Sequence, residues 1–219
     1  MLLPTENDAM IEAAQIKLIL FDLGGVLIDL DFQRCLDYWG NVNDVELSIV
    51  FDKIIDDEQY RLHEIDAIDF NAFYRHISAK FGLSLTEQQF QIGWNRVLLG
   101  IVPDIETLLQ RIEPSISLAI FSNTNWTHED HWRREFVPLW PYFDSIFTSN
   151  RLKIRKPDTD AYLQVLVALH ADPQQVIFFD DSLVNINGAR AAGIKHSYLV
   201  KNNQDISRIL DIAGLLERA

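Results

Sequence analysis

An aspartate placed directly after a short apolar segment is the first residue in this sequence whose position suggests chemistry. The segment from Leu18 to Phe21 leads into Asp22, and the pair Gly24-Gly25 follows. A short apolar run bounded by turn residues is typical of a buried parallel strand, and ligands bind beyond the carboxyl ends of such strands. A carboxylate there can be a nucleophile or a magnesium ligand, whereas an isolated aspartate could equally cap the next turn.

Two later apolar segments lead into residues suited to phosphate. The tripeptide Ser122-Asn123-Thr124 offers hydroxyl, amide and backbone N–H groups ahead of a helix expected to start near Trp126. Such groups at a helix N-terminus bind phosphate oxygens. The pair Lys156-Pro157 follows the next segment, and this lysine can reach into a pocket as a point charge. Taken singly, the tripeptide could be an ordinary N-cap and the lysine a solvated surface residue.

A further apolar segment ends in a pair of adjacent acids. Two phenylalanines lead into Asp180 and Asp181, and acids in such surroundings are costly unless a cation compensates them. Alone, the pair could cap the helix that follows. Together with Asp22 and a phosphate, these carboxylates would make a magnesium site. Lys156 would then neutralise the remaining phosphoryl oxygens, so the set as a whole points to phosphoryl transfer.

The elements that must position these residues follow from the hydrophobic pattern. Short apolar runs alternate with helical patterns, which is typical of a doubly wound parallel sheet. The sequence therefore predicts an α/β fold with a Rossmann-like core. The predicted strands are Lys17 to Leu23, Ile116 to Ser122, Ser145 to Thr148, Gln175 to Phe179 and His196 to Val200. The predicted helices are residues 105–112 behind an Asp104 N-cap, 162–169 opened by Pro157-Asp158, 184–192 ended by Gly193, and 206–213.

The segment between the first two predicted strands is the exception, since it shows only helical patterns. About 65 residues are too many for a loop, so the segment predicts a small helical cap above the carboxyl edge of the sheet. The predicted organisation is an irregular leader over residues 1–15, a core over 16–31 and 98–219, and a cap over 32–97.

Composition and charge narrow the class of protein. The chain has 219 residues, with 32 acidic against 19 basic side chains and a formal net charge of -13. This balance argues against nucleic acid and anionic membranes as partners. Cys35 is the only cysteine, so no intramolecular disulfide can form, and no apolar stretch is long enough for a membrane helix. A soluble cytoplasmic protein, monomeric by preference, is expected.

At this point the motifs resemble those of the haloacid-dehalogenase-like superfamily, in its phosphatase group with a helical cap after the first motif. Within it, the chain looks like the branch of α-D-glucose-1-phosphate phosphatases. The resemblance covers most of residues 17–200. The motifs that carry it are Phe21-Asp22-Leu23-Gly24-Gly25-Val26 continuing to Asp29-Leu30-Asp31-Phe32, then Ser122-Asn123-Thr124-Asn125, Arg155-Lys156-Pro157 and Phe178-Phe179-Asp180-Asp181.

The resemblance implies a Mg²⁺-dependent phosphatase that acts through an aspartyl-phosphate on a small phosphorylated metabolite. Glucose 1-phosphate is the leading substrate. Implied roles are the nucleophile at Asp22, phosphate binding at Ser122, Asn123 and Thr124, a lysine holding phosphoryl group and nucleophile at Lys156, and Mg²⁺ ligation by Asp22, the Gly24 carbonyl, Asp180 and Asp181.

One position departs from the family pattern. Most phosphatases that the chain resembles carry a second aspartate two residues after the nucleophile, which protonates the leaving oxygen and then activates water. Here that residue is Gly24. A leaving group of low pKa such as an anomeric hydroxyl, a substitute such as His63 or His128, or slow turnover would each account for it.

Substrate selection is expected from the cap. Arg61, His63 and Glu64 form a polar stretch able to meet sugar hydroxyls, and His63 is a candidate substrate-binding residue. Trp39 and Trp94 could wall the pocket, although a solvated stretch and core tryptophans are equally compatible with the sequence.

Two alternative functions remain open. A metal-independent 2-haloacid dehalogenase also uses the first aspartate and lacks the second, but it has no need of the Asp180-Asp181 pair. A catalytically weak scaffold or phosphate sensor is compatible with the glycine at position 24.

Overall fold

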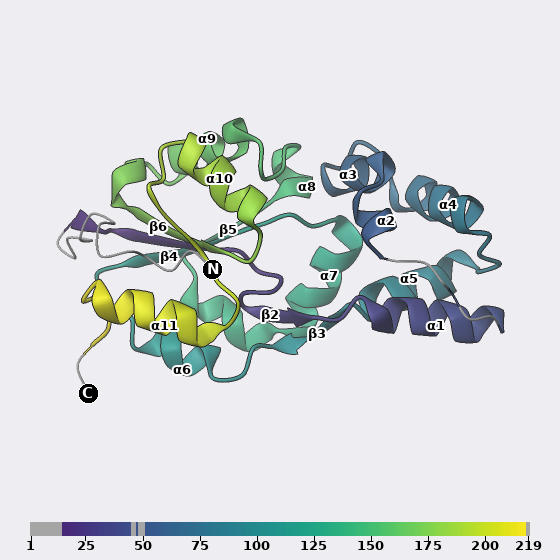
Figure 1. Ribbon diagram of the computed structural model, residues 1–219, viewed down its shortest axis with the longest axis horizontal. Coiled ribbons are helices and arrows are strands. Elements are labelled where there is room, and N and C mark those ends of the chain that lie inside the picture. Colours follow the sequence, from purple (N-terminus) through teal and green to yellow (C-terminus); the bar gives the residue numbers. More distant parts are fainter. Residues whose placement is uncertain (1–14, 45–46, 48–50, 218–219) are drawn as a thin grey trace.

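A computed structural model describes residues 15–44, 47 and 51–217 of the chain. The leader expected over residues 1–15 therefore lies almost entirely outside the described residues. Within them, a five-stranded parallel sheet has the order β5-β4-β1-β6-β7, so the first strand lies at its centre (Figure 1). Its strands are β1 (Leu18–Phe21), β4 (Ser117–Ser122), β5 (Ser145–Thr148), β6 (Val176–Asp180) and β7 (His196–Leu199).

Helices cover the sheet on its two faces. In Figure 1, α9 and α10 lie on one side of the strands, and α6 and α11 lie on the other. The core helices are α6 (Ile105–Gln110), α7 (Trp126–Glu135), α8 (Ser149–Leu152), α9 (Thr159–Ala168), α10 (Leu183–Ala191) and α11 (Asn203–Ile212), with the 3-10 helices η2 (Val137–Tyr142) and η3 (Pro173–Gln175).

The alternation of β1 explains why the sheet has a core on each face. Ile19 and Phe21 pack with α6 and α11, whereas Leu18 and Leu20 pack with α9 and α10. Successive side chains of a strand point to opposite faces, and a strand buried on both is apolar throughout. The predicted doubly wound α/β fold is confirmed.

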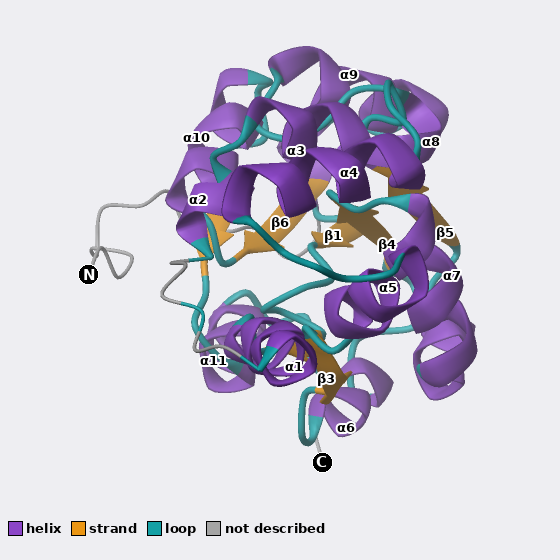
Figure 2. Cartoon of the chain, turned by 90° about the vertical axis from the view of Figure 1, so that its right-hand side faces the viewer, coloured by secondary structure: helices purple, strands orange, loops and turns teal. Residues whose placement is uncertain are grey.

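The helical segment between the first two core strands lies over one end of the sheet. In Figure 2, α3, α4 and α5 lie in front of the strands. The segment comprises α1 (Gln33–Asn43), α2 (Asp52–Ile55), α3 (Glu58–Glu64), α4 (Phe70–Phe81) and α5 (Glu87–Asn95). We call these helices the cap.

An antiparallel pair of short strands joins the cap to the core. β2 (Ile28–Leu30) precedes the cap and pairs with β3 (Leu98–Ile101), which follows it. Sequence patterning missed both strands, because three or four residues are too few to establish a period. The pairing holds the two connections to the cap side by side.

The cap has its own aromatic core. Trp39 stacks on Phe90 with ring centroids 4.3 Å apart, and Phe73 lies 5.0 Å from Trp94. Both tryptophans are buried within this cluster. Trp39 donates a hydrogen bond from Nε1 to the carbonyl of Phe90 at 3.0 Å. The two tryptophans therefore stabilise the cap interior, and the expectation that they wall the substrate pocket is wrong.

Helix termini agree with the sequence at most positions. Asp158 caps α9 by accepting from the N–H of Asp160, and Gly193, with φ +96°, follows the end of α10. Asp104 precedes α6 as expected, but its φ is +62° and its side chain makes no capping bond. The predicted Asp104 N-cap is therefore wrong in its mechanism. Within the described residues, none of the helices combines the length and apolar character that crossing a membrane requires.

Candidate active site

The site lies where β1, β4 and β6 end and centres on a buried lysine between two carboxylates. Lys156 is fully buried, and its Nζ lies 2.9 Å from Asp22 Oδ1 and 2.7 Å from Asp180 Oδ2. Asp22 extends β1 by donating its N–H to the carbonyl of Phe179 at 2.8 Å. Residues 134 positions apart in sequence are thus joined by the sheet topology (156 − 22 = 134).

The pKa values of Asp22 and Lys156 show an excess of negative charge at the site. Burial raises the pKa of Asp22 to about 8, and the charges of Asp180 and Asp181 add to the rise, while Lys156 opposes it. Burial alone would lower the pKa of Lys156, but the two carboxylates outweigh this effect and raise it. One lysine therefore does not neutralise the acids around it.

Asp180 is fixed by the turn that starts α10. Its Oδ1 accepts from the N–H of Ser182 at 2.8 Å, and the side-chain amide of Asn185 donates to both carboxylate oxygens at 3.0 and 3.1 Å. Ser182, rather than either acid, is the residue before the helix. The interpretation of Asp180-Asp181 as a helix cap is therefore not needed. Asn185 was missed, because a single asparagine inside a helix gives no sequence signal.

Asp22, Asp180 and Asp181 together have the composition of a magnesium site. Each offers a carboxylate oxygen, and these atoms lie within 4.8 Å of one another. Asp22 and Asp180 are buried and Asp181 is exposed, so the cluster opens toward solvent on one side. Clustered hard oxygen ligands suit Mg²⁺, which keeps waters and substrate oxygens in its remaining positions. The residues present therefore fit the ion.

Gly25 leaves room for the carboxylate cluster because it has no side chain. Its φ is +75°, and a Cβ at this position would lie 2.2 Å from Asp181 Oδ2. Gly24 differs, because a Cβ there would lie 2.8 Å from Leu30 Cδ1. The space that a second aspartate would occupy is therefore filled by the end of a leucine side chain.

The predicted phosphate tripeptide lies beside Lys156. Asn123 uses both ends of its amide on the lysine backbone, accepting from its N–H at 2.9 Å and donating to its carbonyl at 2.8 Å. The side chain of Asn123 thus positions the lysine segment. Ser122 is buried, with its hydroxyl 3.4 Å from the Asn123 carbonyl, and Asn125 is the residue that caps α7.

His128 is held in place by hydrogen bonds on both ring nitrogens. Nε2 donates to the carbonyl of Trp94 at 3.0 Å, and Nδ1 accepts from the side chain of Asn125 at 3.3 Å. Burial lowers its pKa to about 3. This neutral ring joins α5 of the cap to α7 of the core, so the suggestion that His128 replaces the missing general acid is wrong.

His63 lies among aromatic side chains of the cap. Its ring stacks on Phe73 with centroids 4.6 Å apart and is almost fully buried. Neither ring nitrogen makes a well-formed hydrogen bond. Burial lowers the pKa of His63 to about 4. The ring is therefore neutral near pH 7 and cannot supply a proton readily.

A different cap residue reaches the core beside the lysine. Glu64 is buried, and its Oε2 lies 3.0 Å from Nε of Arg155, the residue that precedes Lys156. The phenol of Tyr60 lies near this pair, and burial together with the charge of Glu64 raises its pKa. Asp22 contributes to the same rise, so Tyr60 shares the electrostatic environment of the strand ends. Arg61 is exposed.

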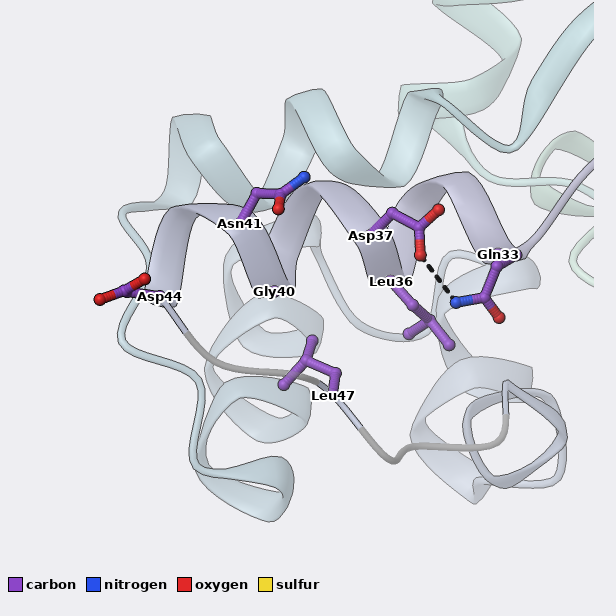
Figure 3. A pocket seen from close by; sticks show the side chains of 7 residues that line it. All are labelled: Gln33, Leu36, Asp37, Gly40, Asn41, Asp44 and Leu47. Atoms are coloured by element: carbon purple, nitrogen blue, oxygen red, sulfur yellow. Dashed lines mark hydrogen bonds between the residues drawn. The ribbon is translucent and has the colours of Figure 1, made fainter.

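A separate hollow lies along the outer side of the cap. It has a volume of about 540 Å³, and along its wall Gln33 donates a hydrogen bond at 2.8 Å to Asp37, one turn further along α1 (Figure 3). Its lining contains none of the candidates for phosphate or metal binding, so the chemistry belongs to the strand ends. The lining residues are Gln33, Leu36, Asp37, Gly40, Asn41, Asp44 and Leu47.

Most of the chain matches a known protein family. A model of haloacid dehalogenase-like hydrolases matches residues 16–193. The match begins just before β1 and ends after α10, so it contains the ends of β1, β4 and β6 that form the site, together with the cap.

Individual relatives are distant but extend over nearly the whole chain. A sesquiterpene phosphatase of Aspergillus oryzae is 26% identical, over 90% of this chain and 97% of its own. A D-ribitol-5-phosphate phosphatase of Bacteroides thetaiotaomicron is 23% identical, over 82% and 90%. A solved enzyme from the same bacterium, in complex with magnesium and inorganic phosphate, is 27% identical with a TM-score of 0.75, over 89% of this chain and 98% of that one.

Proposed function

This chain belongs to the haloacid dehalogenase-like hydrolase family and is a phosphatase within it, and we propose that its substrate is a small phosphorylated sugar or polyol. The observation that carries the reaction is the buried contact of Lys156 with Asp22 beside the acidic cluster. A nucleophile, a cation for phosphoryl oxygens and a magnesium site are thereby gathered at one place. Positioning and electrostatic stabilisation of this kind supply most of phosphoryl-transfer catalysis.

In the proposed reaction, Asp22 attacks the phosphorus in line with the departing alcohol oxygen. The bond from phosphorus to that oxygen breaks, the departing oxygen takes up a proton from solvent, and an aspartyl-phosphate remains. Water then attacks the phosphorus and gives up a proton to solvent, the bond from phosphorus to Asp22 breaks, and inorganic phosphate is released. Lys156 favours the charged form of the Asp22 carboxylate, since it opposes the rise in its pKa, and would neutralise a phosphoryl oxygen, a role supported by its 2.9 Å contact with Asp22.

The remaining site residues are assigned by their place around this pair. Ser122 and Thr124 would bind phosphoryl oxygens, and Asn123 would support them from its position against the lysine backbone. Mg²⁺, when bound, supplies positive charge against the phosphoryl oxygens and the nucleophile. The residues that would hold it are Asp22, Asp180, Asp181 and the carbonyl of Gly24.

The class of substrate follows from the relatives and from the glycine at position 24. The ribitol-phosphate relative favours polyhydroxylated alcohols, and within this class glucose 1-phosphate is our leading candidate. Its anomeric oxygen leaves more readily than an ordinary alkoxide, so the glycine at position 24 would cost less there. We propose that the cap comprises residues 32–97 over a core of 16–31 and 98–219. His63 stays a predicted substrate contact, and its buried ring nitrogens, which make no well-formed hydrogen bond, are the groups that would meet substrate hydroxyls. The dehalogenase alternative offers no use for the acidic cluster.

Phosphate release from a panel of esters tests this function. The panel contains glucose 1-phosphate, glucose 6-phosphate, ribitol 5-phosphate, farnesyl phosphate and an aryl phosphate, each assayed with and without Mg²⁺. We expect magnesium-dependent release that disappears in Asp22→Asn, with the sugar and polyol phosphates ahead of farnesyl phosphate. A preference for farnesyl phosphate would contradict the substrate class. The lack of any release by folded, magnesium-binding protein would contradict catalysis itself.

A further inference from the structure

Glu64 contacts the catalytic end of the sheet through its backbone and through its side chain. The residue lies at the end of α3, in the cap, and is only 2% exposed. Its backbone carbonyl accepts a hydrogen bond from Ser149 Oγ at 2.7 Å. Its carboxylate pairs with Arg155 at 3.0 Å. These partners belong to the segments that follow β5, and each leads to a different phosphate-binding loop.

The backbone contact leads to the loop after β4. Ser149 Oγ accepts from the N–H of Thr124 at 2.9 Å and lies 3.0 Å from the carbonyl of the same residue. The hydroxyl therefore joins the backbone of Glu64 to the backbone of Thr124. Since Thr124 belongs to the proposed phosphate tripeptide, the position of the cap helix is coupled to that loop.

The side-chain contact leads to the lysine. Arg155 directly precedes Lys156, whose backbone is also bracketed by Asn123. The guanidinium of Arg155 pairs with Glu64 of the cap. The ammonium of Lys156 pairs with Asp22 and Asp180 of the core. The short segment is thus held from the core by an amide and from the cap by an ion pair.

The burial of this ion pair distinguishes it from its neighbour. The side chains of Arg155 and Glu64 are 25% and 3% exposed, and a buried pair must offset a considerable desolvation penalty. Lys153 and Asp66 also join core to cap, but their side chains are 54% and 31% exposed. An exposed pair contributes little to stability. The two pairs therefore offer a matched comparison at one interface.

We propose that Glu64 is a positioning residue for phosphoryl transfer, which places the Thr124 and Lys156 loops together when the cap covers the site. This inference rests on the proposed function and extends it to a residue outside the motifs that bind phosphate. Through Arg155 the carboxylate sets the placement of Lys156 above Asp22, and through Ser149 the carbonyl sets the placement of Thr124. A misplacement of about 1 Å can cost on the order of 100-fold in rate.

Kinetics of Glu64→Gln test the proposal, because this change removes the charge and keeps the backbone contact. We expect kcat to fall by about 10- to 100-fold, by the same factor for an aryl phosphate and a sugar phosphate. A group that protonates the leaving oxygen would instead lower kcat only for the poorer leaving group. Loss restricted to the sugar phosphate would therefore overturn positioning in favour of direct proton transfer.

A double-mutant cycle identifies the partner. Arg155→Met should lower kcat to a similar extent, and the combined variant should be little worse than either single one, because both changes break the same contact. Asp66→Asn is the control, with kcat expected within about twofold of wild type because its pair is exposed. Additive losses in the double variant, or equal losses in Asp66→Asn, would overturn the role of the Glu64–Arg155 pair.

Hydrogen exchange provides a readout that does not require turnover. In Glu64→Gln, the backbone amides of residues 122–125 and 155–156 should exchange faster than in wild type, and those in Asp66→Asn should not. Unchanged exchange in both loops would overturn the proposal even if activity fell. If the wild type hydrolyses none of the esters, the proposed function fails, while the exchange experiment still decides whether Glu64 couples the loops.

Discussion

At the scale of single residues, the backbone of Gly25 sets a limit on the metal site. A Cβ there would lie 2.2 Å from Asp181 Oδ2, so any side chain must displace a proposed magnesium ligand. We expect Gly25→Ala to weaken Mg²⁺ binding at least tenfold and to lower magnesium-dependent hydrolysis accordingly. Calorimetric titration with Mg²⁺ measures the affinity directly.

Gly82 provides the control for backbone strain. Its φ is +67°, close to the +75° of Gly25, and a Cβ there would have no neighbour within 4 Å. Gly82→Ala should therefore cost about 1 kcal/mol of stability and leave Mg²⁺ affinity unchanged. Equal losses of Mg²⁺ affinity in the two variants would show that strain, rather than contact with Asp181, governs the site.

The sequence identified the residues that could react or bind metal, but not the residues that hold them in position. Asp22, Lys156 and the acidic pair could be singled out because each ends an apolar segment, and parallel strand ends meet at one edge. The structure brings these strand ends together, with Lys156 Nζ 2.9 Å from Asp22 and the carboxylate oxygens of the three acids within 4.8 Å of one another. Asn185 and Ser149 gave no such signal, since their roles depend on which loops the tertiary fold brings together.

At the scale of elements, the start of α3 decides how Glu64 is presented. Asp57 caps the helix by accepting from the N–H of Gln59, and it also binds His76 and Lys80 of α4. Burial alone would raise the pKa of Asp57, but these hydrogen bonds and charges outweigh it and lower the pKa to about 2. One carboxylate therefore fixes α3 and α4 relative to each other.

Replacing this carboxylate should destabilise the cap in a pH-dependent way. A lowered pKa contributes stability above the unfolded value near 4, and this stability disappears as pH falls toward 2. We expect Asp57→Ala to cost about 1–2 kcal/mol at pH 7 and to approach wild type near pH 2. Denaturant unfolding at several pH values measures the difference. A cost that stays constant with pH would contradict this account.

Among the elements, the strands of the five-stranded sheet were predictable, and the short strands β2 and β3 were not. β5 matches its predicted bounds, and the other core strands differ by a residue or two at their ends. Continuous apolar runs identify strands buried on both faces. β2 and β3 are stabilised by pairing with each other, at Ile28 with Ile101, and this pairing leaves no periodic pattern.

At the scale of the whole molecule, neutral histidines line the boundary between cap and core. His128 bonds Trp94 of the cap and Asn125 of the core, and His63 lies at the end of α3. Burial lowers their pKa values to about 3 and about 4. Below pH 6.5 these two histidines therefore bind protons in the unfolded chain but not in the folded chain, and the free energy of unfolding falls as pH decreases.

Removing one of these histidines should reduce that pH dependence. Each contributes up to about 1.4 kcal/mol of lost stability per pH unit between its unfolded and folded pKa. We expect wild type to lose stability from pH 6.5 to 5, and His128→Gln to lose it with a shallower slope. Chemical denaturation across this range is the measurement. Identical slopes would show that the ring is protonated in the folded protein.

The antiparallel pairing of β2 with β3 also bears on how such a chain can be altered. Because Leu30 lies opposite Leu98, the points where the polypeptide leaves and re-enters the sheet domain are neighbouring positions, about 5 Å apart. The 67 residues between them (98 − 30 − 1 = 67) are therefore an insertion whose two ends are adjacent in space. Replacing this insertion by one of different length leaves the path of the sheet strands unchanged. The fold is therefore modular at this connection, provided that a replacement segment again supplies the contacts that Glu64 makes with Ser149 and Arg155.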